Sequence, residues 1–152
     1  MLNVGDAVPD FTLESDSAGL ISSKALRGQR YVIYFYPKDD TPGCTKEACS
    51  FRDHMPDFKD LGVPVFGASA DDAKAHAKFV GKYQLNFPLL IDPEKKLLEA
   101  FGVWTEKSMY GRTYMGVLRA TFVVGADGKV EQVWPKVKPE GHGAEVLAWL
   151  KS

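Results

Sequence analysis

The segment YPKDDTPGCTKEAC, residues 36–49, holds both cysteines of the chain, Cys44 and Cys49. It overlaps a β-branched and aromatic run, Tyr31 to Tyr36, that is typical of a buried parallel strand. Beyond the run, apolar residues recur at spacings of three and four and predict an amphipathic helix that begins near Cys44. This apolar stripe consists of Ala48, Phe51, Met55 and Phe58. The sequence therefore predicts a strand, a tight turn and a helix, with Cys44 in the first helical turn.

Strand and helix patterns continue to alternate along the rest of the chain. The expected strands are Val63–Ala68, Leu89–Ile91, Ala120–Val124 and Val130–Trp134, and the expected helices are Asp72–Tyr83 and Ala144–Leu150. The last two strands should form a hairpin, because the Asp127-Gly128 pair between them is a turn signal. This order predicts an α/β protein with a thioredoxin-like fold, in which helices flank a mixed central β-sheet.

Composition and charge narrow the functions that the chain can have. Its 152 residues, 45% of them hydrophobic and 26% charged, suit a single globular domain spanning residues 1–152. A net charge of −1 provides no field to attract nucleic acid or an anionic membrane, so small neutral ligands are expected. The start MLNVGDAVPDF has no secretory signal, and no later apolar run is long enough for a membrane span. We therefore expect a cytoplasmic protein and, with no long apolar seam visible, a monomer.

The two cysteines admit several interpretations. In the cytoplasm thiols are kept reduced, so a close pair is more often catalytic, redox-sensing or metal-binding than structural. An iron–sulfur cluster needs four thiolates, and the Cys-x-x-Cys motif of dithiol exchange is missing. A zinc site could recruit His54, His76 or His142, but none has metal-ligand spacing to another ligand, and no metal is expected. Two unrelated buried thiols remain the simplest alternative.

The expected position of Cys44 favours nucleophilic chemistry. Unpaired N–H groups in the first turn of a helix stabilise a thiolate. A stabilised thiolate is also a weaker nucleophile, so a low pKa alone gives little gain in reaction rate. Most of the rate acceleration of such an enzyme must come from hydrogen-bond donors that stabilise the charge developing on the substrate. Cys49 lies five residues further along, at about 8.6 Å between Cα atoms in an intact helix. A disulfide needs less than about 7 Å, so the two cysteines can bond only if the first turn and a half unwinds.

The segment from Pro37 to Cys44 matches the peroxiredoxin signature Pro-x-x-x-Thr/Ser-x-x-Cys, and its continuation through Cys49 resembles the bacterioferritin-comigratory, or Q-type, branch of that family. The resemblance covers nearly the whole chain. It includes the stretches GDAVPDF near the start, WTEKSMYG from Trp104, RATF from Arg119, and the Gly141-His142 pair.

This resemblance implies roles for individual residues. Cys44 would be the peroxidatic cysteine and Cys49 the resolving cysteine. Thr41 would hydrogen-bond thiolate and peroxide, Pro37 would shield the pocket, and Arg119 would hold both reactants with its guanidinium. Without the resemblance, Thr41 would be interpreted as a helix-start residue and Arg119 as a surface strand residue.

The resemblance also implies a reaction and its partners. The Cys44 thiolate would reduce hydrogen peroxide or an organic hydroperoxide and become a sulfenic acid, with backbone N–H groups near Gly43 helping to stabilise the separating oxygens. Cys49 would then form a disulfide with Cys44, and thioredoxin or a similar dithiol reductant would restore both thiols. No metal or organic cofactor is needed. The alternative is a redox-regulated binding protein or holdase, which would sense peroxide without sustained turnover.

Three features of the sequence leave their roles open. Glu47 would either orient Arg119 or another polar neighbour, or simply be an acidic residue favoured in a first helical turn. Asp39 and Asp40 oppose a thiolate unless they point to solvent, so turn chemistry is the expected reason for them. A cluster between Trp104 and Met115 would border the pocket or receive a reductant, but core or loop packing is the first expectation; its other members are Met109, Tyr110 and Tyr114.

Overall fold

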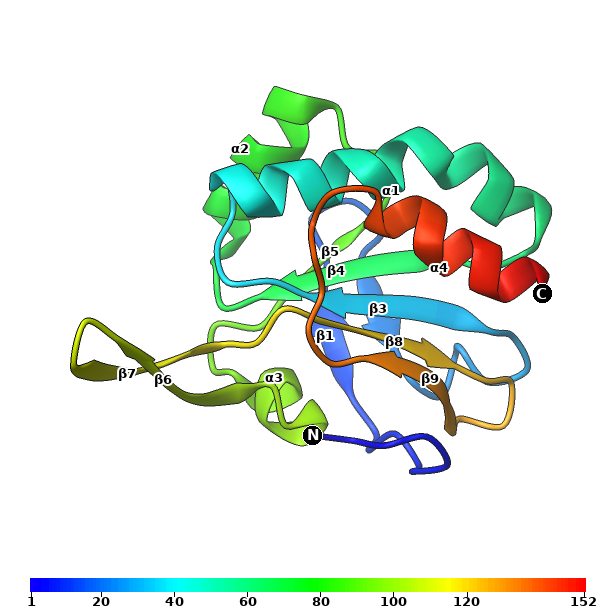
Figure 1. Ribbon diagram of the computed structural model, residues 1–152. Helices are drawn as coiled ribbons and strands as arrows, with labels where there is room; N and C mark the ends of the chain where they lie inside the picture. Colours follow the sequence, from blue (N-terminus) through cyan, green and yellow to red (C-terminus); the bar gives the residue numbers. More distant parts are fainter.

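A five-stranded mixed sheet forms the centre of the computed structural model, which describes all 152 residues (Figure 1). The strand order is β5-β4-β3-β8-β9. Strand β3 pairs in parallel with β4, which pairs in parallel with β5, whereas β3–β8 and β8–β9 are antiparallel. The strands are β3 (Tyr31–Phe35), β4 (Val65–Ser69), β5 (Leu89–Ile91), β8 (Ala120–Val124) and β9 (Val130–Trp134). The α/β architecture with a mixed sheet is therefore confirmed.

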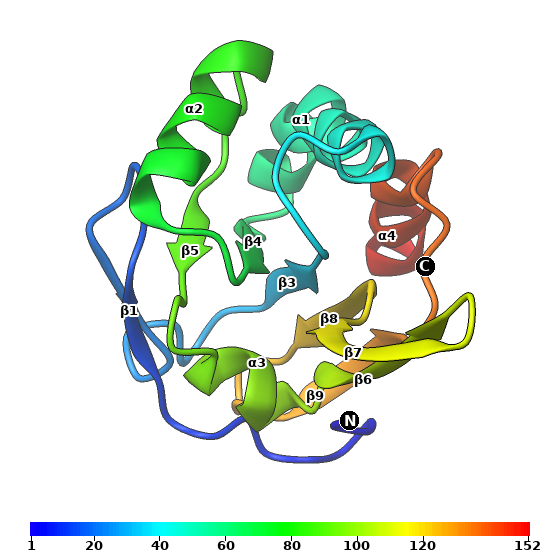
Figure 2. The same ribbon diagram turned by 90° about the vertical axis from the view of Figure 1, so that its left-hand side faces the viewer.

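Helices cover both faces of the sheet (Figures 1 and 2). On one face lie α1 (Pro42–Asp60), α2 (Ala73–Tyr83) and α4 (His142–Lys151), and on the other lies α3 (Lys96–Phe101). Successive side chains of a strand point to opposite faces, so β3 supplies both cores. Its Val32 and Tyr34 pack beneath α1, while Ile33 and Phe35 pack toward α3. This double burial explains the uninterrupted apolar run. None of the helices is long and apolar enough to span a membrane.

Most predicted elements occur close to their expected positions. β5, β8 and β9 have the predicted bounds, and α1 begins two residues before Cys44. β4 begins two residues later than expected, because Val63 belongs to the turn that closes α1, where its N–H donates to the carbonyl of Phe58. Two strands of three residues each, β1 (Thr12–Glu14) and β2 (Leu20–Ser22), were not predicted, and neither was α3.

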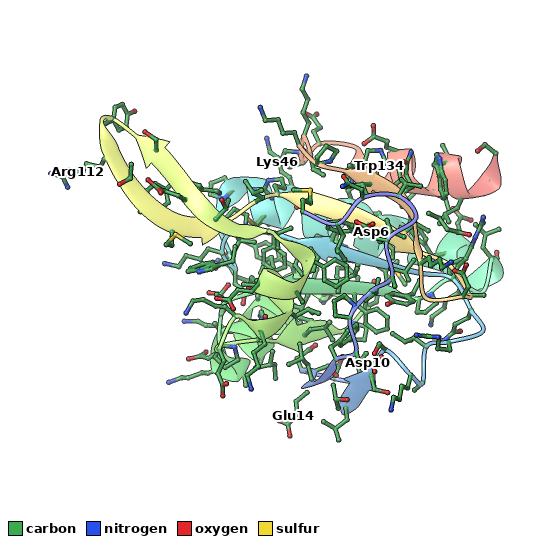
Figure 3. All side chains as sticks on the ribbon, turned by 90° about the horizontal axis from the view of Figure 1, so that it is seen from below. Asp6, Asp10, Glu14, Lys46, Arg112 and Trp134 are labelled. Carbon is green, nitrogen blue, oxygen red and sulfur yellow. The ribbon has the colours of Figure 1, made fainter.

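A second unpredicted hairpin joins β6 (Trp104–Met109) to β7 (Arg112–Val117). It extends away from the sheet, and Arg112 lies near its tip (Figures 1 and 3). The turn consists of Tyr110 and Gly111, both with positive φ, as a two-residue hairpin turn requires. Tyr110 is 98% exposed, and Met109, Tyr114 and Met115 are also exposed. Of the expected core or loop packing, packing in the core is therefore wrong for these four residues.

Helix α1 is fixed to its surroundings beyond its first two turns. Pro56 lacks an N–H, which leaves the carbonyl of Arg52 without a helical partner, and the side chain of Asn86 donates to that carbonyl instead. On the other side α4 crosses very closely, and the N–H of Gly143 donates to the hydroxyl of Ser50. A Cβ on Gly143 would lie 2.6 Å from the carbonyl oxygen of Ser50. Close packing of α4 therefore depends on glycine at this position.

Gly143→Ala should lower the free energy of unfolding by about 1–3 kcal/mol, because the new methyl group would push α4 away from α1. Gly81→Ala, inside α2, is the matched control: a Cβ there meets no atom within 4 Å. That substitution should raise stability by about 0.5–1 kcal/mol through helix propensity. Urea denaturation of the two variants measures both effects. Similar stability in both variants would show that the packing of α4 on α1 does not need the close approach of Gly143 to Ser50.

Candidate active site

Cys44 lies in the first turn of α1, at the end of the loop that leaves β3 (Figure 1). Its side chain is 1% exposed. The N–H groups of Gly43 and Cys44 donate to no backbone oxygen, because no preceding helical turn supplies carbonyls for them. The sulfur atom therefore lies beside the positive end of the helix dipole and next to two unused donors.

Arg119 reaches this sulfur from the neighbouring strand. It directly precedes β8, whose Ala120 is paired with Phe35 at the end of β3, so its side chain starts beside the loop that leads to α1. Its Nη2 lies 3.3 Å from Sγ of Cys44. A Cβ on Gly43 would lie 3.1 Å from the same Nη2, so glycine leaves room for the guanidinium. Two separate parts of the chain thus bring a cation and a thiol into contact.

The second guanidinium nitrogen of Arg119 holds Glu47. Nη1 lies 2.8 Å from Oε1 of this carboxylate, which is 0% exposed, while Oε2 has no hydrogen-bond partner. Burial raises the pKa of Glu47 to about 7, although the nearby charge of Arg119 lowers it. Of the two interpretations left open by the sequence, the geometry favours orientation of Arg119. A solvated first-turn acid would be neither buried nor paired in this way.

Thr41 and Pro37 lie on the loop but do not touch the sulfur through hydrogen bonds. Thr41 is the N-cap residue of α1, yet its hydroxyl does not cap the helix and donates to the carbonyl of Lys38 at 2.9 Å. Pro37 lines a cavity of about 330 Å³ between the loop and the β6–β7 hairpin. Trp104, Tyr114 and Met115 of the hairpin line the same cavity. These residues of the cluster therefore border a pocket next to the loop that ends in Cys44.

Lys107 is a charged residue of this pocket that sequence reasoning missed. It lines the cavity from β6. Its pKa is lowered by burial and by the charge of Arg119, while Cys44 acts in the opposite direction. The pocket beside the loop therefore has a cation in its wall on the hairpin side. Side-chain alternation along β6 would place Lys107 on the same face of the strand as Thr105. No local pattern connects that face with a cysteine about sixty residues earlier, so the sequence alone did not reveal this position.

Cys49 is half-buried on α1, and both cysteines are free thiols. The helix between them is continuous from Pro42 to Asp60. The ideal separation of about 8.6 Å therefore applies, and it exceeds the limit for a disulfide.

Asp39 and Asp40 occupy a turn, as expected, but Asp39 does not point to solvent. It is buried and lies 2.6 Å from Nδ1 of His76. The carboxylate of Asp40 is bound by Lys82 and Tyr83. Both acids are thus paired with α2.

The three histidines lie in different environments. His54 contacts the carbonyl of Ser50, and His142 contacts Thr121 and Glu145. Ligand atoms of His76, Asp39 and Asp71 lie within 4.8 Å of one another. Both nitrogens of His76 are already engaged, by Asp39 and by the carbonyl of Leu90, so this cluster is hydrogen-bonded internally.

Comparisons with known proteins agree on one family. Residues 4–133 match the AhpC/TSA family. The putative peroxiredoxin Bcp of Coxiella burnetii is 46% identical over 149 residues, which cover 98% of this chain and 99% of that protein. Peroxiredoxin Bcp of Escherichia coli is 44% identical over 150 residues, covering 99% and 96%.

A solved structure extends this similarity to the fold. The bacterioferritin comigratory protein of Xanthomonas campestris, studied for its alkyl peroxide reduction activity, matches with a TM-score of 0.90 and 40% identity. The match covers 99% of this chain and 96% of that one. The thioredoxin-like fold expected from the sequence is thereby confirmed.

Glu47→Gln should remove a pH dependence of stability. Because the pKa of Glu47 rises from 4.5 to about 7 on folding, the folded protein keeps a proton that the unfolded chain has lost. Stability should therefore fall by about 3 kcal/mol in total between these two pH values and stay level above them. Glutamine does not titrate, so the variant should lack this decrease. Urea denaturation of both reduced proteins at about pH 5 and about pH 8 gives the difference. The same change in both proteins would contradict the assigned burial of the carboxyl.

Proposed function

Because the chain belongs to the AhpC/TSA family of peroxiredoxins and is a thiol peroxidase, we propose that Cys44 is its peroxidatic cysteine. The contact of 3.3 Å between Nη2 of Arg119 and Sγ of Cys44 is the observation that carries this assignment. A buried thiol beside a guanidinium and two unused backbone donors is placed where groups that stabilise negative charge surround the reacting sulfur. The sulfur of Cys49 has no hydrogen bond to a guanidinium, so Cys49 suits a later step of the reaction.

In the peroxide step the Cys44 thiolate attacks one oxygen of a hydroperoxide in line with the O–O bond. A sulfur–oxygen bond forms as the O–O bond breaks, and the other oxygen takes a proton and leaves as water or an alcohol. Cys44 becomes a sulfenic acid. Arg119 and the N–H groups of Gly43 and Cys44 stabilise the charge on the separating oxygens.

Thr41 has a narrower role in this step than the family resemblance implies. Its hydroxyl proton is already donated to the carbonyl of Lys38. The lone pairs of the oxygen remain available, so Thr41 would accept the O–H of the hydroperoxide rather than donate to the thiolate. Such a contact orients the substrate in line with Cys44.

Cys49 completes the cycle as the resolving cysteine. Its thiolate attacks the sulfenic sulfur of Cys44, a disulfide forms, and the sulfenic oxygen leaves as water. The first turn and a half of α1 must unwind to bring the sulfur atoms together. A thiol reductant then restores both thiols, and a thioredoxin-like dithiol is our proposed partner.

The substrates are hydrogen peroxide and organic hydroperoxides. The related Xanthomonas campestris protein is described for alkyl peroxide reduction. In this chain the cavity beside Pro37 has Trp104, Tyr114 and Met115 in its wall, and these side chains suit an alkyl group. All of the site residues come from one chain, so the scheme requires only a monomer.

Cys44→Ser should reduce peroxide consumption to the uncatalysed background, because the attacking sulfur is gone. Cys49→Ser should keep the first oxidation but lose thioredoxin-linked turnover, because no disulfide can form within the chain. Sulfenic acid is trapped after one turnover and located by mass spectrometry, which measures the first oxidation in both variants. A coupled thioredoxin assay measures the second.

The opposite pattern would reverse the assignment, namely sulfenic acid in Cys44→Ser but none in Cys49→Ser. The unchanged protein serves as the control for sustained turnover. A single stoichiometric oxidation without further consumption would instead favour the redox-regulated binding protein.

A further inference from the structure

A buried chain of hydrogen bonds ties the loop before Cys44 to helix α2. The hydroxyl of Tyr36, the residue after β3, donates to Oδ1 of Asp39 at 2.5 Å. The other carboxylate oxygen of Asp39 lies 2.6 Å from Nδ1 of His76 on α2. Nε2 of His76 lies 2.8 Å from the carbonyl oxygen of Leu90 on β5. The imidazole is 0% exposed, so no solvent replaces these partners.

The two neighbours of His76 require two ring protons. A backbone carbonyl only accepts, so Nε2 must donate to Leu90. The carboxylate of Asp39 also accepts, so Nδ1 must donate to it unless Asp39 itself is protonated. Burial lowers the pKa of His76, but the hydrogen bond and charge of Asp39 outweigh burial, and the net pKa is raised. The link is therefore a charge-assisted hydrogen bond, which is stronger than a neutral one.

The neighbouring residue adds a second contact to the same helix. Asp40 has a φ of 57°, in the left-handed region that is unfavourable for most residues other than glycine. Nζ of Lys82 and the hydroxyl of Tyr83 hold its carboxylate at 2.9 and 2.7 Å. Lys82 and Asp40 are exposed, so this contact is the weaker of the two. The turn conformation that leads into α1 is thus held from α2 at two consecutive residues.

We propose that His76 is a positioning residue for peroxide reduction, which holds the loop before α1 through Asp39 and so sets the balance between a closed and an open first turn. The inference rests on the proposed function of Cys44 and Cys49. In the closed form Arg119 and the helix N-terminus surround the sulfur, as the peroxide step requires. In the open form Cys49 can reach it.

The structure places this link at one boundary of the segment that must open. Asp39 lies five residues before Cys44, and the segment ends at Ser50, whose hydroxyl accepts from Gly143 of α4. Between these two attachments lie Cys49 and the start of α1, whose contacts with Arg119 through Cys44 and Glu47 are released when the segment opens. Release of Asp39 from His76 would weaken the hold on the loop at one end, where the N–H of Asp39 still donates to Asp71. The Ser50 contact would keep the remainder of α1 in place.

The balance has a measurable chemical consequence. A sulfenic acid in the closed form is exposed to a second peroxide, which oxidises it to sulfinic acid, with the O–O bond of the peroxide breaking and water or alcohol leaving. A sulfenic acid in the open form is captured by Cys49 as a disulfide. The peroxide concentration at which half of Cys44 ends as sulfinic acid, the half-point, therefore reports how readily the turn opens.

His76→Gln and Asp39→Ala break the link from its two sides. Both should raise the half-point concentration about tenfold, which corresponds to about 1.4 kcal/mol in the opening equilibrium. Asp39→Asn should change it by no more than about threefold, because an amide can donate to neutral His76 and still accept from Tyr36. Intact-mass spectrometry of the reduced protein after titration with hydrogen peroxide separates the disulfide, which lacks two hydrogens, from the sulfinic acid, which gains two oxygens.

Phe87→Leu is the control for general destabilisation, because Phe87 is buried in the core beneath α1 and its ring packs against those of Tyr34 and Phe51, which are not part of the link. It should lower the melting temperature and leave the half-point within about twofold. Amide exchange over residues 38–45 of the reduced protein should be faster in His76→Gln than in Phe87→Leu.

Equal half-points in His76→Gln, Asp39→Ala and Phe87→Leu would overturn the inference, as would an Asp39→Asn value as high as that of Asp39→Ala. Failure of Cys44 in the unchanged protein to form either product would instead overturn the proposed function. The two failures are therefore distinguishable.

Discussion

The guanidinium of Arg119, shared between the sulfur of Cys44 and the buried carboxylate of Glu47, is the interaction around which the site is organised. It constrains the fold in two ways. Gly43 must lack a side chain, because a Cβ there would press against the guanidinium. β8 must pair antiparallel with β3 in a register that places Ala120 opposite Phe35, because only then does Arg119 begin where the loop to α1 leaves the sheet. The carboxylate neutralises part of the charge of Arg119, so the charge available to the sulfur depends on the protonation of Glu47.

Two steps of the reaction make opposite demands on α1. The peroxide step uses an intact helix N-terminus, with its free N–H groups beside Cys44. The disulfide step needs that turn undone, since five helical residues separate the cysteines by about 8.6 Å. The structure divides the helix accordingly. From Ser50 onward α1 is fixed by α4, by Asn86 and by its buried Phe51, Met55 and Phe58. Its first two turns are held by the preceding loop and by the contacts of Arg119 with Cys44 and Glu47. Local opening therefore leaves the core packing from Phe51 onward in place.

Local patterns in the sequence predicted the parts of the fold that have such patterns. The central strands and α1 follow from apolar runs and from spacings of three and four, and the β8–β9 hairpin follows from Asp127-Gly128. The family signature pointed to the residues around Cys44. The features that the sequence did not predict depend on contacts between polar residues that are far apart in the chain. Asp39 and His76 are 37 positions apart, and nothing in either neighbourhood indicates that they meet. The β6–β7 strands are mostly exposed, so they lack the apolar alternation that marks a half-buried strand.

Amide hydrogen exchange in the reduced and the disulfide form tests most directly the claim that a helical site must unwind to complete its cycle. The strand Tyr31–Phe35 serves as an internal reference, because it is buried along its whole length. The account predicts markedly faster exchange over residues 42–52 in the disulfide form, greatest between the two cysteines, with unchanged protection in the strand. Equal protection of residues 42–52 in the two forms would contradict it, because the cysteines would then bond without any opening of the helix.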